Sequence, residues 1–313
     1  MQFWPRVKAK RQYAKVRSWT TDSKDSVLGF IGYKVGMTHI IGIDTRKTSI
    51  TKGEEVAMPV TVIECPPMKI AGVRLYKVKY LKKQPFKDVL FKLDKNMSRK
   101  VTMPKKAHDL AELDDSKDVT DVKLLVYTQP TLAGIGKKKP EFVEFGMSGS
   151  VADKIKFAKD NHDKELLVTT LFKEGEFVDV HAVTKGKGLQ GPVKRFGVDF
   201  KAHKTEKGVR RVGTLGSWSG QGHVLYRVPH PGQMGYHLRT EYNKQIFKIS
   251  SKPEEINPKG AFPHYGNVKS TYVVVKGSVA GPQKRAILFT KCTRQKFQDT
   301  IPTITYISQE SKS

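Results

Sequence analysis

Short apolar runs rich in β-branched residues, each bounded by glycine or proline, recur along the chain. Residues 27–44 alternate between apolar and polar positions and are broken by glycines, and the run 60–65 stops at a Pro-Pro pair. Runs with such boundaries are typical of strands. Comparable runs return late, at residues 166–172, 176–183, 271–275 and 286–292. Strands at both ends of a chain, with different material between them, predict one sheet system interrupted by insertions, and a glycine-rich set favours a small closed barrel.

The same pattern divides the chain into segments. We expect a basic N-terminal arm over residues 1–25, a β-barrel built from 26–76, 165–184 and 265–300, an α-rich insertion over 77–164, a basic central extension over 185–264, and a C-terminal tail over 301–313. A last strand is expected after residue 296, before the polar end of that tail. The predicted fold class is mainly β with α insertions, an α+β protein.

The insertion is expected to hold one helix pair. Ser150 is a candidate N-cap, and apolar residues follow it at helical spacing at Val151, Ile155 and Ala158. Six acids against one lysine lie between Asp109 and Asp121. Because nucleic acid repels such a patch, we expect it to face solvent or a basic partner.

Residues 181–250 hold thirteen lysines and arginines against three acids, five of the nine histidines and eleven of the 26 glycines. Within 201–223 the only strongly apolar residues are Ala202, Val209, Val212, Leu215 and Trp218. So little burial cannot offset an ordering cost of roughly 1–2 kcal/mol per residue. Alone in water the segment should be disordered or loosely held, so we predict that it folds against a polyanion. We interpret it as a two-limbed finger with Trp218 near the tip; burial of that ring in a local mini-core is the alternative.

A net charge of +27, with a pI near 9.9, favours nucleic acid as that polyanion. A membrane surface is less suitable because no basic amphipathic helix is evident and no run of about 20 apolar residues occurs. The arm interleaves cations with Phe3, Trp4, Tyr13 and Trp19, a composition suited to phosphate contacts and base stacking. The alternative for the arm is a disordered tail. The N-terminus lacks an apolar segment of the kind that directs secretion, so we expect a cytoplasmic protein.

Motifs for catalysis are weak or missing. Residues 186–191 satisfy G-x-G-x-x-G, but no long helix and no βαβ pattern surround them. Bare N–H groups there, with Lys185, Lys187, Lys194 and Arg195 nearby, suit a phosphate of a polymer better than a dinucleotide. The histidines fall in no metal-binding frame, and Cys65 and Cys292 stand far apart and fit buried thiols. We therefore expect no catalytic residue, no metal site and no cofactor.

Three long motifs resemble the universal large-subunit ribosomal protein L three family, in its archaeal form. They are GEFVDVHAVTKGKGLQGPVKRFGV, KAHKTEKGVRRVGTLGSW and HPGQMGYHLRTEYNKQIFKI, and FWPRVKAKR and the turn at 281–285 extend the similarity over nearly the whole chain. The resemblance implies a six-stranded β-barrel of the translation-protein type, split by an α-rich lobe and a long rRNA-binding finger. It also implies a structural constituent of the large subunit, without catalysis, which binds rRNA of the 3′ domain early in assembly.

By the same resemblance the finger supports the A-site side of the peptidyl-transferase centre. The residues expected to bind rRNA are Arg6, Lys8, Lys10, Arg11, Lys185, Lys187, Lys194, Arg195, Lys201, Lys204, Lys207, Arg210, Arg211, His237, Arg239 and Lys244, with Trp218 at the finger tip. Proteins L fourteen and L twenty-four e are the expected neighbours, and Mg²⁺ would be carried by the rRNA. Eukaryotic members have a histidine where Glu206 stands, so nothing attributed to that histidine is transferred. An acid at this position needs a cation, a metal ion or a base donor beside it, and Lys204 and Lys207 are the first candidates. A free-standing RNA chaperone and an RNA-modifying enzyme are the alternatives.

Overall fold

The computed structural model describes residues 3–20, 27–104, 119–216, 222–294 and 301–310. The chain divides into two compact units: a smaller unit of residues 1–12 and 183–239, and a larger unit of residues 13–182 and 240–313. Trp218 and most of the acidic patch between Asp109 and Asp121 lie outside the described residues.

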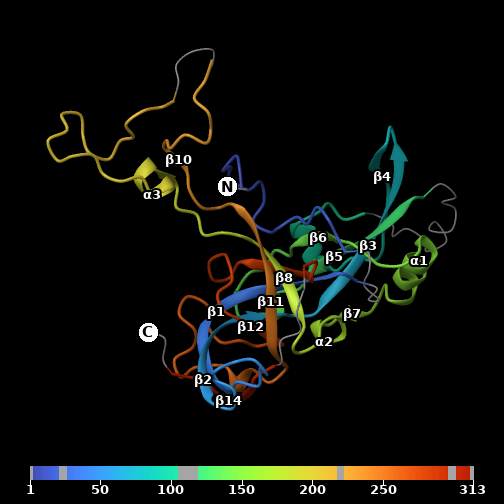
Figure 1. The fold of residues 1–313 in the computed structure, drawn as a ribbon. Helices are drawn as coiled ribbons and strands as arrows, with labels where there is room; N and C mark the ends of the chain where they lie inside the picture. Colours follow the sequence, from blue (N-terminus) through green and yellow to red (C-terminus); the bar gives the residue numbers. More distant parts are fainter. Residues whose placement is uncertain (1–2, 21–26, 105–118, 217–221, 295–300, 311–313) are drawn as a thin grey trace. The chain divides into compact units, whose positions relative to one another are not determined.

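A seven-stranded sheet dominates the larger unit (Figure 1). Its strand order is β13-β8-β11-β12-β2-β1-β14, and β13 also pairs with β1. Six of these strands therefore form a closed circuit of pairings, with β14 outside it. The strands are β1 (Gly29–Ile43), β2 (Glu55–Glu64), β8 (Phe177–Val183), β11 (Leu238–Ser250), β12 (Tyr272–Lys276), β13 (Ala286–Lys291) and β14 (Thr303–Ile307).

The strand β1 is long enough to pair with three other strands. It pairs antiparallel with β13 over 29–33, with β2 over 33–43 and with β14 over 40–43. A Cβ at Gly32 would lie 2.7 Å from both Cys65 Sγ and Ile63 Cγ2. A side chain there would clash, which explains a glycine at this position inside a strand. The predicted runs 60–65, 176–183, 271–275 and 286–292 fall on strands of this sheet. The predicted strand at 166–172 was wrong, because most of that run forms the short helix at Val168–Leu171.

A second sheet, in the order β4-β3-β5-β6, occupies much of the segment predicted to be α-rich. It consists of β3 (Met68–Lys79), β4 (Lys82–Leu90), β5 (Asp121–Thr128) and β6 (Phe142–Phe145), with β7 (Glu165–Leu166) paired to β3. The α-rich prediction was wrong: among the described residues of 77–164, α1 (Val151–Asp160) is the only α-helix. Both faces of β5 are covered: residues 122, 124 and 126 belong to the main hydrophobic core, whereas 125 and 127 belong to a second cluster, as expected when successive side chains of a strand point to opposite faces.

The helix α1 begins as the sequence predicts. Ser150 accepts a hydrogen bond from the Asp153 N–H, and the Asp153 carboxylate accepts one from the Ser150 N–H, which makes a capping box. Short helical segments complete the larger unit: α2 (Val168–Leu171) and the 3₁₀ turns η1 (Lys95–Arg99), η3 (Pro130–Leu132) and η4 (Pro253–Glu255). No helix among the described residues is long and apolar enough to cross a membrane.

Three predicted boundaries differ from the structure. The strand β3 was assigned to the barrel through residue 76, but it belongs to the second sheet. The strand β11 was assigned to the extension, but it pairs between β8 and β12 in the large sheet. The segment 303–307 was placed in the C-terminal tail, outside the barrel; the last strand expected after residue 296 is present there, as β14, but it pairs with β1 in the large sheet. Each error has one cause: pairing partners lie far away in the sequence, so local pattern does not select the sheet.

The indole of Trp19 is packed against the core of the larger unit. It meets Phe145 edge to face, with ring centroids 5.8 Å apart. A Cβ on Gly146 would lie 2.5 Å from the indole, so the absence of a side chain there makes room for the ring. The expectation that this ring stacks on a base therefore meets an indole that is already partly buried within the chain.

The smaller unit has few regular elements. A two-residue ladder joins β9 (Leu189–Gln190) to β10 (Gly232–Gln233), and α3 (Pro192–Phe196) follows β9. Between α3 and β10 the chain makes a long excursion, drawn yellow to orange in Figure 1, in which the described residues form no helix and no strand.

Candidate nucleic-acid interface

Charge is concentrated in the smaller unit. Its residues 1–12 and 183–239 carry fifteen lysines and arginines against two acids, Asp199 and Glu206. This is a net charge of +13 out of +27 for the whole chain, in less than a quarter of its length. The arm and the extension, distant in the sequence, therefore belong to one strongly basic unit.

Arg195 holds the base of the extension together. Its guanidinium donates from Nε to the Gln233 carbonyl at 3.1 Å and from Nη1 to the His230 carbonyl at 3.1 Å. A Cβ on Gly232 would lie 2.8 Å from the guanidinium carbon, so a glycine is needed there. Arg195 is only 9% exposed, and burial lowers its pKa. The predicted phosphate-binding arginine thus uses these donors to join the two limbs.

The arm packs onto the same base. Trp4 stacks on Phe196 with ring centroids 5.6 Å apart and planes inclined by 24°. The Arg6 guanidinium lies 4.7 Å and 4.4 Å from the centroids of these two rings and donates to the Arg195 carbonyl. Such cation–π contacts contribute roughly 0.5–2 kcal/mol each. The arm is therefore ordered by the extension through groups that sequence reasoning assigned to RNA.

His237 forms a second anchor for the arm. Its Nδ1 donates to the Val7 carbonyl at 2.8 Å, and its side chain is 7% exposed. Burial lowers its pKa, which favours the neutral form of the ring. The Ala9 N–H also donates to the Tyr236 carbonyl at 2.8 Å. His237 was predicted to bind rRNA, but its Nδ1 already donates a hydrogen bond within the chain.

The residues of the G-x-G-x-x-G motif form part of a two-stranded ribbon. The Lys187 N–H donates to the Met234 carbonyl, and the Met234 N–H donates to the Gly188 carbonyl, both at 2.9 Å. At Gly235, which has a φ of 71°, a Cβ would lie 2.1 Å from the Lys185 carbonyl oxygen. Gly235, which lies outside the motif, thus lets the two limbs approach closely, whereas a Cβ at Gly188 or Gly191 would meet nothing within 4 Å. The expectation that no dinucleotide fold surrounds the motif agrees with this ribbon.

Most predicted cations project into solvent. No described residue between 196 and 234 is buried. The exposed members of the predicted set are Lys8, Lys10, Arg11, Lys185, Lys187, Lys194, Lys204, Lys207, Arg210 and Arg211, and Lys201 is partly buried. The guanidinium carbon of Arg210 lies 5.0 Å from the centroid of the Phe200 ring. The excursion therefore exposes cationic and aromatic side chains, and its described residues form no core of their own.

The remaining predicted residues lie elsewhere or are engaged. Arg239 sits over Phe3 at 4.8 Å and its pKa is lowered by burial. Lys244 lies on β11 in the larger unit, where its Nζ donates to the Ser278 carbonyl at 2.8 Å and pairs with Glu241 at 3.3 Å. Glu206 is exposed, and among the described residues neither Lys204 nor Lys207 pairs with it. These two lysines, the first candidates for its partner, therefore do not pair with it within the described part of the chain.

Sequence reasoning missed the stack of Trp4, Arg6 and Phe196. Alternation of rings and cations in the arm was visible, but nothing local showed that the partner ring lies almost two hundred residues away. Tyr226 and Arg227 on the returning limb were also missed; both are exposed, and Tyr226 contacts Trp4 with centroids 5.7 Å apart.

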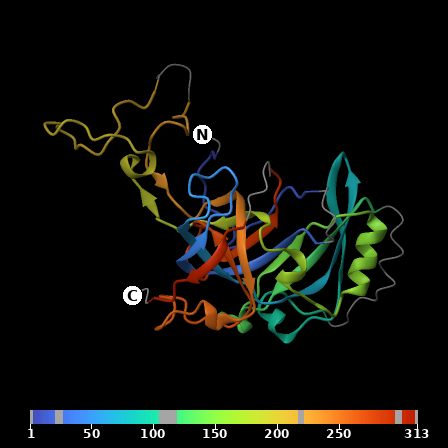
Figure 2. The ribbon, with the colours of Figure 1, turned by 60° about the horizontal axis from the view of Figure 1, so that its bottom comes forward.

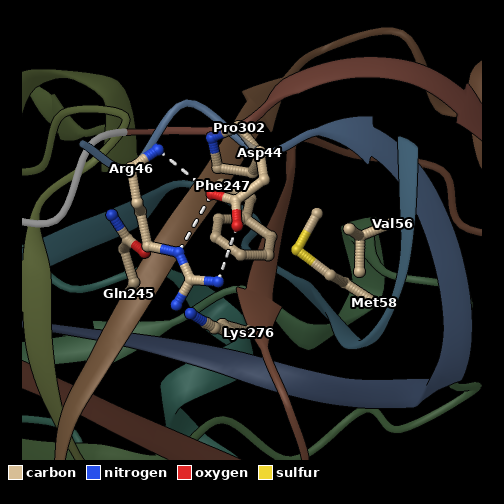
Figure 3. Close-up of a pocket in the computed structure, with 8 residues that line it drawn as sticks. All are labelled: Asp44, Arg46, Val56, Met58, Gln245, Phe247, Lys276 and Pro302. Carbon is tan, nitrogen blue, oxygen red and sulfur yellow. Dashed lines mark hydrogen bonds and ion pairs between the residues drawn. The ribbon is translucent and has the colours of Figure 1, made fainter. Parts of the chain in front are cut away.

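A small cavity lies in the larger unit, and Figure 3 shows its lining. Its volume is about 170 Å³, below the roughly 300–1,000 Å³ of ligand pockets. The Asp44 carboxylate on its wall accepts hydrogen bonds from Arg46, Ser49 and Thr51, of which the Arg46 bonds contribute most to a strongly lowered pKa. The described residues also contain no group of three His, Cys, Asp or Glu placed to hold a metal ion. These features do not form a catalytic site.

The family and the relatives that this chain matches are consistent with its strongly basic smaller unit. Residues 1–312 match the family model described as ribosomal protein L3. The large ribosomal subunit protein uL3 of Archaeoglobus fulgidus is 45% identical over 100% of this chain and 96% of its own length. The proteins of the same name from Methanococcus vannielii and Methanosphaera stadtmanae are 44% and 42% identical over at least 99% of this chain and 95% of their own lengths. The chain belongs to the ribosomal protein L3 family, a family of structural proteins of the large ribosomal subunit.

Proposed function

We propose that this protein binds large-subunit rRNA directly through its smaller unit and aids early subunit assembly. The central extension would support the A-site side of the peptidyl-transferase centre, as the family resemblance implies. The observation that carries the proposal is the excursion between residues 196 and 234, where no described residue is buried and six lysines and arginines face two acids. A segment with so little internal packing requires an external surface to hold one conformation.

The mechanism is release of counterions over many phosphates. Exposed cations of the excursion and of the arm would contact phosphate oxygens, because these side chains project into solvent and can reach a partner. The Arg195 and His237 anchors would fix the angle between the arm and the two limbs. Peptide bond chemistry would remain with the RNA, and the protein would supply position and charge.

The closed circuit of six strands supports the proposal that the larger unit contains a barrel of the translation-protein type. Proteins L fourteen and L twenty-four e remain the proposed neighbours of this unit. Structural Mg²⁺ would be carried by the rRNA and not by the protein. A stoichiometric complex with large subunits that survives a salt wash would separate this proposal from a free-standing RNA chaperone.

The test measures the salt dependence of binding. Full-length protein is titrated with transcribed large-subunit rRNA of the source organism between about 50 and 200 mM salt, where neutralising six to ten phosphates should reduce affinity roughly 10³- to 10⁵-fold. Lys204→Gln/Lys207→Gln should reduce the slope of log affinity against log salt by about 0.7–0.9 for each phosphate that is no longer neutralised. The control variant, Lys52→Gln/Lys156→Gln, changes two exposed lysines of the larger unit. A slope near zero in the wild-type protein would refute the proposed mechanism.

A further inference from the structure

The hairpin of β3 and β4 extends past the sheet to which it belongs. Residues 68–76 of β3 pair with β5, whereas 77–79 pair only with residues 82–84 of β4. The tip projects beyond β5, β6 and α1 of the same unit in Figure 1, and it also projects in the turned view of Figure 2. Two strands without a third strand or a covering element are marginal in water. This part of the larger unit therefore lacks the packing that orders the rest of the sheet.

The tip exposes large apolar side chains. Every residue from 78 to 88 is exposed. The exposed fractions are 98% for Leu81, 82% for Tyr80 and 57% for Phe86. Single exposed apolar residues are common, but three within seven positions on one hairpin indicate a contact surface.

The turn is strained. Tyr80 and Leu81 have φ values of 51° and 59°, in the left-handed region. A two-residue hairpin turn with both central residues there favours Asn-Gly, because bulky L-residues are disfavoured in this region. Lys79 and Lys82 are also paired directly across the strands, which places two like charges opposite each other. The residues at the tip are therefore poor choices for the stability of the hairpin alone.

The hairpin is also basic. Its lysines are Lys77, Lys79, Lys82, Lys83 and Lys87. Lys83 pairs with Asp121 at 3.1 Å, and the one acid of the hairpin, Asp88, is held by Arg74 at 2.6 Å. Among the described residues no acid pairs with Lys79 or Lys82. The Lys79 ammonium lies 5.3 Å from the centroid of the Tyr80 ring, so a cation flanks an exposed aromatic face.

We propose that the β3–β4 hairpin is a second RNA-binding element, formed by the larger unit. Tyr80 stacks on an unpaired base of the large-subunit rRNA, and Lys79 and Lys82 contact the flanking phosphates. The inference rests on the proposed function for the identity of the polyanion. An exposed ring between two exposed cations suits a base and its phosphates. Strain at a fully exposed turn is explained when the turn meets a ligand.

The first experiment maps the hairpin directly. An iron chelate that generates hydroxyl radicals is attached at Leu81→Cys, and separately at Lys204→Cys, in the Cys292→Ser background. Each full-length protein is bound to transcribed large-subunit rRNA, and strand cleavage is read out. Localised cleavage from position 81 supports the proposal. Cleavage from position 204 alone overturns it and leaves the proposed function standing, whereas no cleavage from either position overturns both.

The second experiment separates stability from binding. Tyr80→Asn/Leu81→Gly gives the turn the dipeptide its backbone favours and removes the ring and the leucine. We expect unchanged or increased thermal stability and a roughly tenfold or larger loss of affinity for the rRNA. Lys79→Gln/Lys82→Gln should lower the salt slope by about 0.7–0.9 for each phosphate that these lysines neutralise. Unchanged rRNA affinity in both variants would overturn the proposal and favour an acidic protein as the partner.

Discussion

A buried carboxylate, Glu64 at the end of β2, gives the sharpest test of the larger unit. It is 0% exposed. Its Oε1 accepts from the Lys269 N–H at 2.7 Å, the Ser270 N–H at 2.9 Å and the Ser270 hydroxyl at 3.0 Å. Its Oε2 accepts from the Gly134 N–H at 3.0 Å and from the Tyr265 hydroxyl. The side chain therefore joins β2 to two loops that are far apart in the sequence.

The perturbation is Glu64→Gln, which preserves the shape and removes the charge. The amide group of Gln has one acceptor oxygen, and its NH₂ group faces donors wherever it points. In the less costly orientation the NH₂ group replaces Oε2, the Tyr265 hydroxyl turns to accept from it, and the Gly134 N–H remains buried without an acceptor. An unsatisfied donor costs about 1–3 kcal/mol, and the other bonds lose their charge assistance. We expect a loss of about 3–6 kcal/mol in the free energy of unfolding.

The assay is urea denaturation of the full-length protein, followed by tryptophan fluorescence. The control is Glu55→Gln, an exposed glutamate on the same strand, which should change the free energy of unfolding by less than about 0.5 kcal/mol. Tyr265→Phe removes one of five donors and should cost about 1–3 kcal/mol. A Glu64→Gln protein within about 1 kcal/mol of wild type would refute the idea that the carboxylate holds these loops.

Other predictions concern the base of the extension, a buried histidine and a helix cap. Arg195→Ala should expose the arm and the limbs to limited proteolysis, whereas Lys194→Ala, on the exposed side of α3, should leave the proteolytic pattern unchanged and weaken rRNA binding; identical proteolysis of the two variants would contradict this. Burial lowers the pKa of His181, whose ring lies between the hydroxyls of Thr240 and Thr290, so the unfolded state takes up the proton first as pH falls. Stability should therefore decline below about pH 6.5, and His181→Gln should reduce that decline; equal pH profiles of unfolding free energy would be evidence against it. Ser150→Ala should cost about 1 kcal/mol in urea denaturation through loss of the α1 cap, and an unchanged midpoint would show that the cap is dispensable.

Local signals in the sequence were sufficient where the structure depends on near neighbours. The Ser150 cap and the spacing after it predicted α1, because a helix makes its hydrogen bonds within one turn. The runs that became β1, β2, β8, β12 and β13 were recognisable from their β-branched residues and their glycine and proline boundaries. The basic, glycine-rich segment was recognisable because too few apolar residues are available there to form a core.

The surroundings of Glu64 are an example of what local sequence patterns do not predict. A single acid at the end of the run 60–64 looks like the edge of a strand, and only the fold places five donors around it. The same holds for Arg195 and His237, which share the composition of the exposed cations but are buried against carbonyls of the other limb and of the arm.

The sequence alone determined the family of the protein, its strongly basic character and the type of most of its elements, because these depend on composition and on spacing within a few residues. Only the tertiary structure decided that β3, β4, β5 and β6 form a second sheet, that Trp19 packs against the core, and which cations remain exposed for a partner. Strand pairing and burial depend on residues far apart in the sequence, such as Met68 with Thr128 and Trp19 with Phe145, and no local pattern specifies such partners.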